Sequence, residues 1–269
     1  MLFSTYRGYG YEGLQLKAGQ YLSCLDDPGQ AQPVFADDAA FADDAGLCSG
    51  LIFGGQLDDT GLSALRRVID FAALVKSERV VFCHNHPRAE VTADDLRRFA
   101  SVLSSAGSYA HDRGTTLSLH HHYNQPVMFP DDIRLFFEYT QPGSVGLTID
   151  TAHMWMAGVD DVGATIEEFA DVLDNVHLKD CRDDAPGQRL PSGARTATAF
   201  VPLGQGQLDF EPVFRALRST GYSGWLCVDE ESGADIGQSL KLSYDFVSER
   251  LSRPVPPATE PIGTGRYLG

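Results

Sequence analysis

The sequence contains no apolar run long enough to cross a bilayer, no excess of basic residues and no closely spaced cysteines. A transmembrane helix needs about 20 apolar residues, and the first residues lack the apolar core and cleavage site of a secretory signal. The five cysteines are odd in number and form no C-x-x-C pair, which is typical of reduced thiols. We therefore expect a cytoplasmic protein that binds no membrane.

Basic residues are also scarce, because 21 Lys and Arg stand against 37 Asp and Glu in 269 residues, a net charge of −16. Lys and Arg supply most of the affinity for nucleic-acid phosphates. This charge argues against a nucleic-acid partner. The hydrophobic content of 43% is that of a globular protein with a sizeable core.

Short apolar segments alternate with helical patterns along most of the chain. Five of the six intervals between the starts of the predicted strands lie between 29 and 37 residues, close to the roughly 31 residues of one βα unit in an eight-fold barrel. An open doubly wound sheet is the alternative, but no glycine-rich phosphate loop follows an early strand. We predict an α/β TIM barrel. Its strands are Gly13–Lys17, Leu47–Phe53, Arg79–Cys83, Thr116–His120, Val145–Asp150, Asn175–Leu178 and Trp225–Asp229.

Helices are predicted between these strands from apolar residues spaced three or four apart. Thr165 and Glu168 have capping-box spacing, which predicts that a helix starts at Thr165. The predicted apolar faces are Leu62, Leu65, Ile69 and Ala72, then Leu96, Phe99, Leu103 and Ala106, and finally Ile236, Leu240, Tyr244 and Val247.

The beginning of the chain is too short for a complete first βα unit. Either Leu2–Tyr6 is a lone first strand, or it ends a first helix whose strand is missing. In the second case the strands Gly13–Lys17 and Trp225–Asp229 flank a gap with open edges, which invite cover by another segment. We expect the Pro- and Gly-rich tail, residues 252–269, or a second subunit in a homodimer to cover it. Residues 1–251 form the predicted barrel domain.

The longest interval between strands contains Cys181–Gly206, a segment rich in Gly, Pro, Ser and charge. It follows a strand and therefore lies on the C-terminal rim of the barrel, where long loops usually cover active sites. We predict that it is a lid.

Polar residues recur where strands end. Along a barrel strand, alternate side chains face the interior. If the leucines of Leu117–His120 face the helices, His120 points inward, and so does His122 if the alternation continues. The same alternation selects Asp150, His177 and Asp229 on three other strands. Imidazoles and carboxylates that converge on one rim are typical ligands of a divalent metal. His84–His86 follows another strand, and its residues could line this site or merely cap the strand.

Six segments resemble the xylose isomerase-like TIM barrels, a superfamily of sugar isomerases, sugar epimerases, inosose dehydratases and endonuclease IV enzymes. The triple histidine, the D-T-x-H turn and the H-x-K-D motif look most like those of inosose dehydratases. The segments are Tyr11–Leu16, His120–His122, Ile149–His153, Asn175–Asp180, Gly204–Phe210 and Gly221–Leu226.

The resemblance implies a metal site and its surroundings. The family's ligands match His120 or its neighbour, Asp150, His177 and Asp229. The implied metal is Mn²⁺, with Mg²⁺, Co²⁺ or Zn²⁺ as alternatives, and the implied partner is a small sugar or cyclitol. His153 matches a position beside substrate. We expect substrate contacts from Arg182, Asn124, His86 and Glu230.

Some positions depart from the family pattern. Epimerases and many isomerases carry Glu where this chain has His120 and Asp229, and dehydratases carry Met-Gly-Thr where it has Tyr123–Gln125. These departures weaken a two-glutamate epimerase mechanism and leave the substrate open.

The expected activity is that of a metal-dependent isomerase or lyase that removes a proton next to a carbonyl group. His153 and His122 are the candidate base and acid, because an imidazole titrates near working pH, and Lys179 is the candidate for polarising an oxygen. The alternatives are a non-catalytic sugar-binding barrel and an endonuclease IV-type nuclease.

Overall fold

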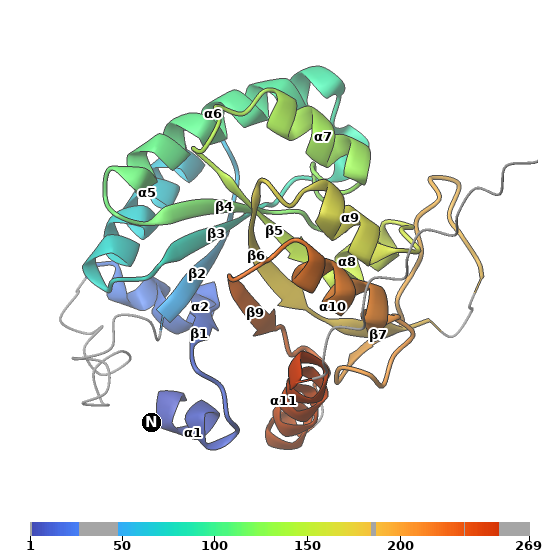
Figure 1. Cartoon of the computed structure of the whole chain (residues 1–269). Coiled ribbons are helices and arrows are strands. Elements are labelled where there is room, and N and C mark those ends of the chain that lie inside the picture. The colour runs from blue at the N-terminus through green and yellow to red at the C-terminus, as the bar shows by residue number, and fades with distance from the viewer. Residues whose placement is uncertain (1, 27–47, 184–186, 234, 253–269) are drawn as a thin grey trace, which may run out of the picture.

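The computed structural model describes residues 2–26, 48–183, 187–233 and 235–252, and its centre is a parallel seven-stranded sheet (Figure 1). The sheet order is β1-β2-β3-β4-β5-β6-β9, so the strands of this sheet lie side by side in the order in which they occur along the chain. This is the predicted barrel. Its strands are β1 (Leu14–Leu16), β2 (Cys48–Gly55), β3 (Arg79–His84), β4 (Thr116–His120), β5 (Gly146–Asp150), β6 (Leu173–Leu178) and β9 (Trp225–Val228).

Each predicted strand is present with small changes at its ends. Leu47, the first residue of the second predicted strand, lies outside the described residues.

Helices cover the outer face of the sheet (Figure 1). The long ones are α5 (Asp59–Leu74), α6 (Ala93–His111), α7 (Pro130–Glu138), α10 (Phe210–Ser219) and α11 (Ile236–Ser252). The short ones are α1 (Leu2–Gly8), α2 (Ala18–Tyr21), η1 (Leu22–Cys24), η3 (Arg88–Glu90), α8 (Thr151–Met156) and α9 (Val162–Glu168).

The predicted apolar faces of α5 and α6 are confirmed. Leu65, Ile69 and Ala72 are fully buried in the core, as is Leu103 of α6. These side chains repeat at helical spacing, so each helix buries one stripe against the sheet and leaves its charges in water. Among the described residues, no helix has both the length and the apolar character needed to cross a membrane.

The predicted start of a helix at Thr165 is wrong. Helix α9 begins three residues earlier, at Val162, because the carboxylate of Asp161 accepts a hydrogen bond from the backbone N–H of Ala164 at 3.0 Å. An aspartate in extended conformation before a helix is a strong N-cap. Thr165 therefore lies inside the helix, where it is buried.

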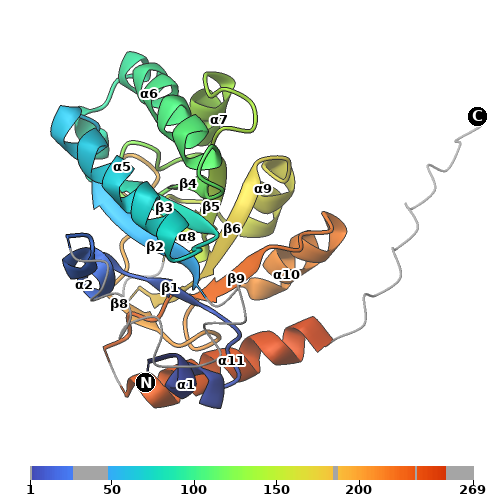
Figure 2. The same cartoon turned by 90° about the vertical axis from the view of Figure 1, so that its left-hand side faces the viewer.

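The N-terminal segment is a helix and not a lone strand, so the helical alternative for Leu2–Tyr6 is confirmed. Strands β1 and β9 end the sheet order on either side of a gap. Helices α1 and α11 lie side by side below this gap (Figures 1 and 2), and the Tyr11 hydroxyl donates to the Leu240 carbonyl of α11 at 2.9 Å.

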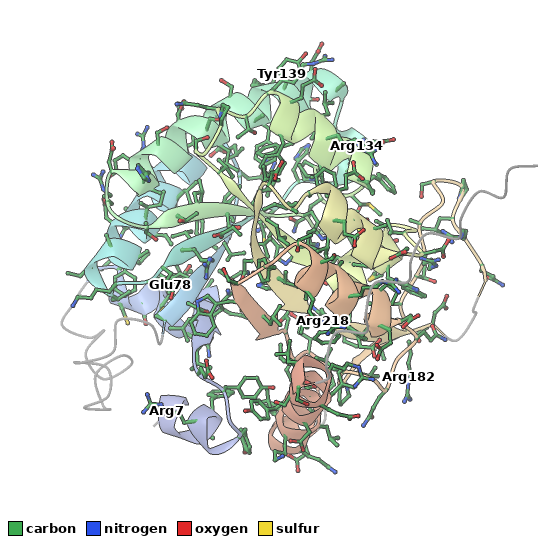
Figure 3. All side chains as sticks on the ribbon, in the orientation of Figure 1. Arg7, Glu78, Arg134, Tyr139, Arg182 and Arg218 are labelled. Carbon is green, nitrogen blue, oxygen red and sulfur yellow. The ribbon has the colours of Figure 1, made fainter. Side chains whose placement is uncertain are left out.

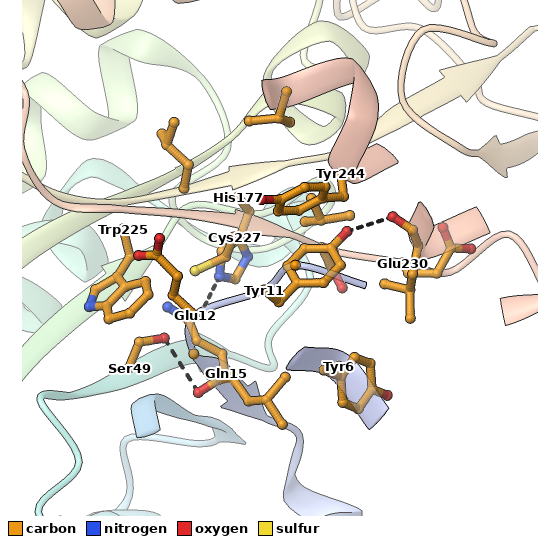
Figure 4. Close-up of a pocket in the computed structure, with 18 of the residues that line it drawn as sticks. Tyr6, Tyr11, Glu12, Gln15, Ser49, His177, Trp225, Cys227, Glu230 and Tyr244 are labelled. Atoms are coloured by element: carbon orange, nitrogen blue, oxygen red, sulfur yellow. Dashed lines mark hydrogen bonds between the residues drawn. The ribbon is translucent and has the colours of Figure 1, made fainter. Parts of the chain in front are cut away.

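A cavity of about 620 Å³ occupies the gap (Figure 4). Its walls include the edge of β9, whose four residues are only partly buried, and the apolar side of α11. On that side Leu240 is buried, but Ile236 is 57% exposed, because no eighth strand of the described chain lies beneath it. Ser252, the first residue of the predicted tail, ends α11, and residues 253–269 lie outside the described residues, so the tail's role as cover stays a prediction.

The segment predicted as a lid contains two short strands that the sequence did not reveal. β7 (Asp180–Arg182) and β8 (Ala199–Val201) form an antiparallel ribbon separate from the barrel sheet. The Arg195 guanidinium donates to the carbonyl groups of Trp155 and Val159 and pairs with Asp160. These contacts hold the segment against the end of α8 and the connection that follows it.

Candidate metal and substrate site

Three neighbouring strands deliver the predicted ligands to one point. His120, Asp150 and His177 are at or next to the C-terminal ends of β4, β5 and β6, and Asp150 and His177 are direct partners in the sheet register. Nε2 of His120 lies 3.1 Å from Nδ1 of His177 and 4.0 Å from Oδ2 of Asp150. One ligand atom from each residue lies within 4.8 Å of the other two.

The burial of this cluster makes it suited to a cation. Asp150 is 0% exposed, and its Oδ2 has no hydrogen-bond partner among the described residues. Burial raises the pKa of Asp150 to about 7 and lowers the pKa of His177 to about 4. A buried carboxylate oxygen without a partner is costly. A divalent cation between this oxygen and two neutral imidazoles would satisfy it, so the residues fit such an ion.

The fourth predicted ligand, Asp229, lies at the same rim but is held by two lysines. Its carboxylate is 2.9 Å from Nζ of Lys179 and 3.1 Å from Nζ of Lys17, and both lysines also bind Glu231. Burial favours the neutral acid, but the positive charges outweigh it and hold the pKa of Asp229 well below its ordinary value. The three-residue cluster above does not include Asp229.

Lys179 is almost fully buried yet keeps its charge. Burial alone would lower its pKa, but Asp150, Asp229 and Glu231 outweigh burial and raise the pKa of Lys179 above its ordinary value. The ammonium also lies 4.2 Å from the ring centre of Phe200 on β8. Lys179 can therefore donate a hydrogen bond but cannot act as a base.

The predicted acid–base pair, His122 and His153, is brought together at the same rim, with ring centres 3.7 Å apart. Nδ1 of His122 is 2.8 Å from the carbonyl oxygen of Tyr123. A carbonyl only accepts, so Nδ1 carries the proton and Nε2 keeps its lone pair. Burial lowers the pKa of both His122 and His153, which keeps the two rings neutral near pH 7.

The middle histidine of the triple has a structural role. His121 is fully buried, and its Nε2 accepts a hydrogen bond from the backbone N–H of Asp150 at 2.9 Å. This contact fixes the end of β5, and with it the backbone of Asp150.

Most of these side chains line a cavity of about 260 Å³, but Asp150 and His121 lie behind its lining. The lining includes His120, His122, His153, His177, Lys179 and Asp229. Sites for drug-sized ligands span roughly 300–1,000 Å³, so this cavity suits a smaller molecule such as a monosaccharide. Three polar residues of the lining were not predicted from the sequence, namely Lys17, Gln125 and Glu231.

A signal for one of them was present. Gln15 and Lys17 alternate with Leu14 and Leu16, so the rule that selected His120 also selects Lys17 on its own strand. Asn85 belongs to the histidine-containing segment His84–His86, of which Asn85 rather than His86 lines the cavity.

The four predicted substrate contacts lie outside the lining of this cavity. Arg182 is exposed at the periphery (Figure 3) and donates to the carbonyl of Gln205 at 3.0 Å. Nε2 of His86 lies 3.7 Å from Oε2 of Glu90 on η3. Both residues therefore have partners away from the cavity.

The other two expected contacts also face elsewhere. Asn124 has a φ of 60° in a turn, and its carbonyl accepts a hydrogen bond from the backbone N–H of Arg88. Glu230 lines the gap between β1 and β9 and accepts from the N–H of Ser232. Asp229 and Glu231 point to the rim, while Glu230 between them points the other way, as alternation along an extended chain requires.

Known proteins share this fold and parts of the sequence. An inosose dehydratase of Clostridium beijerinckii is 31% identical over 154 residues, which cover 55% of this chain and 51% of that protein. The chain spans about half the length of the curated relatives it matches.

Two solved structures are similar in fold. The IolI protein with a bound zinc atom has a TM-score of 0.70 and 15% identity, covering 93% of this chain and 91% of that one. L-ribulose 3-epimerase has a TM-score of 0.67 and 19% identity, with 92% and 86% covered. The xylose isomerase-like TIM barrel family matches residues 24–246. The chain therefore belongs to the xylose isomerase-like TIM barrel family.

Proposed function

We propose that this protein is a divalent-metal-dependent isomerase or lyase that acts on a keto-sugar or keto-cyclitol. The observation that carries the proposal is the cluster of His120, Asp150 and His177, whose ligand atoms lie within 4.8 Å of one another. Oδ2 of Asp150 is buried there and has no hydrogen-bond partner in the part of the chain that the structure describes. Similarity to inosose dehydratases in sequence supports the substrate class. Mn²⁺ is the expected ion.

The metal would be held by His120, Asp150 and His177, with Asp229 at the same rim as the candidate fourth ligand. When bound, a divalent ion supplies a Lewis acid that stabilises negative charge on a substrate oxygen. The remaining work falls to side chains of this chain, which must orient the substrate and move a proton.

His122 is our candidate for the base. Its Nε2 keeps a lone pair because Nδ1 donates to the Tyr123 carbonyl. The adjacent imidazole of His153 is the candidate for the complementary acid or base. Lys179 stays charged and donates a hydrogen bond to a substrate oxygen, which favours loss of the proton from the neighbouring carbon.

The fate of the substrate after proton removal separates the reaction classes. Loss of a β-hydroxyl gives dehydration, whereas return of a proton to another position or face gives isomerisation or epimerisation. All of these reactions begin with removal of the same kind of proton, so exchange of that proton with solvent is their common signature.

The test is incubation of the purified protein in D₂O with a panel of keto-sugars and keto-cyclitols and with Mn²⁺, Mg²⁺, Co²⁺ or Zn²⁺. We expect mass spectrometry to detect metal-dependent deuterium incorporation with at least one substrate. His122→Ala should lose this exchange, and Asp112→Asn, an exposed change at the end of α6, should keep it.

The alternatives predict different results. A non-catalytic sugar-binding barrel binds a sugar without exchanging its protons, and it needs no metal. An endonuclease IV-type nuclease binds duplex DNA at low salt, but the net charge of −16 argues against it. Metal-loaded protein that exchanges no proton in the whole panel would contradict the proposed function.

A further inference from the structure

Gln15 lies in the middle of β1, and its side chain reaches the candidate metal site from the far side of the barrel interior. Its Oε1 is 2.7 Å from Nε2 of His177 on β6 (Figure 4). The two strands are not neighbours in the sheet, since β1 and β6 lie at positions one and six of its order. The contact therefore joins residues 162 positions apart across the interior.

The orientation of the Gln15 amide follows from its other partner. Its Nε2 lies 2.9 Å from Oδ1 of Asn175, and the thiol of Cys227 lies 3.5 Å from the same oxygen. The thiol S–H of Cys227 donates to this atom, which must therefore be the oxygen of Asn175. The nitrogen of Asn175 then faces the hydroxyl of Thr148 at 3.4 Å, which can accept its hydrogen. The Gln15 nitrogen must then face Asn175, and the Gln15 oxygen must face His177.

An amide oxygen can only accept, so Nε2 of His177 carries the proton. A neutral imidazole has one N–H, which leaves the lone pair on Nδ1. Nδ1 is the atom that lies 3.1 Å from Nε2 of His120 in the candidate metal cluster. With the proton on Nδ1 instead, His177 would direct an N–H into the cluster and could not bind an ion.

We propose that Gln15 is a positioning residue that holds His177 in the Nε2–H tautomer and so sets the metal affinity of the site. This inference rests on the proposed function, because it requires the metal cluster. A hydrogen-bond partner behind a ligating histidine fixes both the tautomer and the direction of the ring, and its loss typically costs about 10- to 100-fold in metal affinity.

The experiment measures Mn²⁺ binding by calorimetry in the full chain. We expect Gln15→Leu, which keeps the size but removes the acceptor, to weaken binding about 10- to 100-fold. Gln15→Glu restores an acceptor oxygen, so this variant should bind Mn²⁺ clearly more tightly than Gln15→Leu does. Gln238→Leu, on the exposed side of α11, is the matched control and should bind like the unaltered chain.

A second measurement reads the tautomer directly. Two-dimensional NMR of the ¹⁵N-labelled imidazoles in the metal-free protein should show the His177 proton on Nε2, and Gln15→Leu should populate the other tautomer. This readout does not depend on metal binding. A proton on Nδ1 of His177 in the unaltered chain would overturn the inference even if Gln15→Leu failed to fold.

The two proposals fail separately. Unchanged Mn²⁺ affinity in Gln15→Leu, with binding abolished in Asp150→Ala, would refute the role of Gln15 and leave the metal site standing. Unchanged binding in both variants would refute the metal site itself.

Discussion

Asp180 anchors both ends of the segment Cys181–Gly206. Its carboxylate is 1% exposed and accepts hydrogen bonds from four backbone N–H groups. The distances are 2.8 Å from Cys181, 3.0 Å from Gly204, 2.9 Å from Gly206 and 3.3 Å from Leu208. Three of these donors, Gly204, Gly206 and Leu208, lie at or just beyond the C-terminal end of the segment. This single side chain therefore joins the beginning of the segment to its end.

The expected loss in Asp180→Ala can be worked from these bonds. A hydrogen bond to a charged group contributes about 1.5–3 kcal/mol. The two bonds to Gly204 and Gly206 are short and close the segment, so removing them at the low end of that range costs about 3 kcal/mol. Since every 1.4 kcal/mol is a factor of ten, the segment should open about 150-fold more often.

Amide hydrogen exchange followed by mass spectrometry measures this opening in a peptide that covers residues 199–208. We expect Asp180→Ala to speed its exchange about 150-fold, and Asp180→Asn, which keeps one acceptor oxygen, to have a smaller effect. Asp112→Asn is the control. Exchange within threefold of the unaltered chain in Asp180→Ala would refute the argument that this carboxylate holds the segment closed.

A glycine in the same anchor makes an independent check. A Cβ atom at Gly206 would lie 2.1 Å from Oδ1 of Asp180, closer than two such atoms can approach. Gly206→Ala should therefore loosen the same peptide, although it leaves the carboxylate in place.

Three further predictions concern the metal, the lid and the gap. Asp150→Ala should remove a ligand and most of the bound Mn²⁺ measured by elemental analysis; unchanged stoichiometry would contradict the assignment. Limited proteolysis should cut within Cys181–Gly206, and substrate with metal should slow the cutting if the segment is a lid that closes; equal rates with and without ligand would mean that it is a passive insertion. When the tail, residues 252–269, is removed from monomeric protein, amide exchange at Leu14 of β1 and Leu226 of β9 should be fast, because both strands have open edges. Slow exchange at both residues would show that neither the tail nor a second subunit is needed as cover.

Local patterns were sufficient to predict the barrel and the cluster at the centre of the candidate site. The alternation of side chains along a strand is a property of extended backbone itself, and parallel strands bring all their C-terminal ends to one rim. His120, Asp150 and His177 could therefore be assigned to a common point from sequence. The apolar spacing that predicted α5 and α6 is local in the same way.

Tertiary structure decided everything that depends on contacts between distant segments. The pairing of Asp229 with Lys17 joins the two strands beside the gap, and the short strands β7 and β8 exist only because they pair with each other. Arg182 lies outside the cavity lining because it belongs to the separate ribbon of β7 and β8 and donates to the carbonyl of Gln205. The tautomer of His177 depends on Gln15, which lies 162 residues away. The sequence determined which way each strand presents its side chains. The curvature of the sheet determined which of those side chains meet, because only packing across the interior selects partners from different strands.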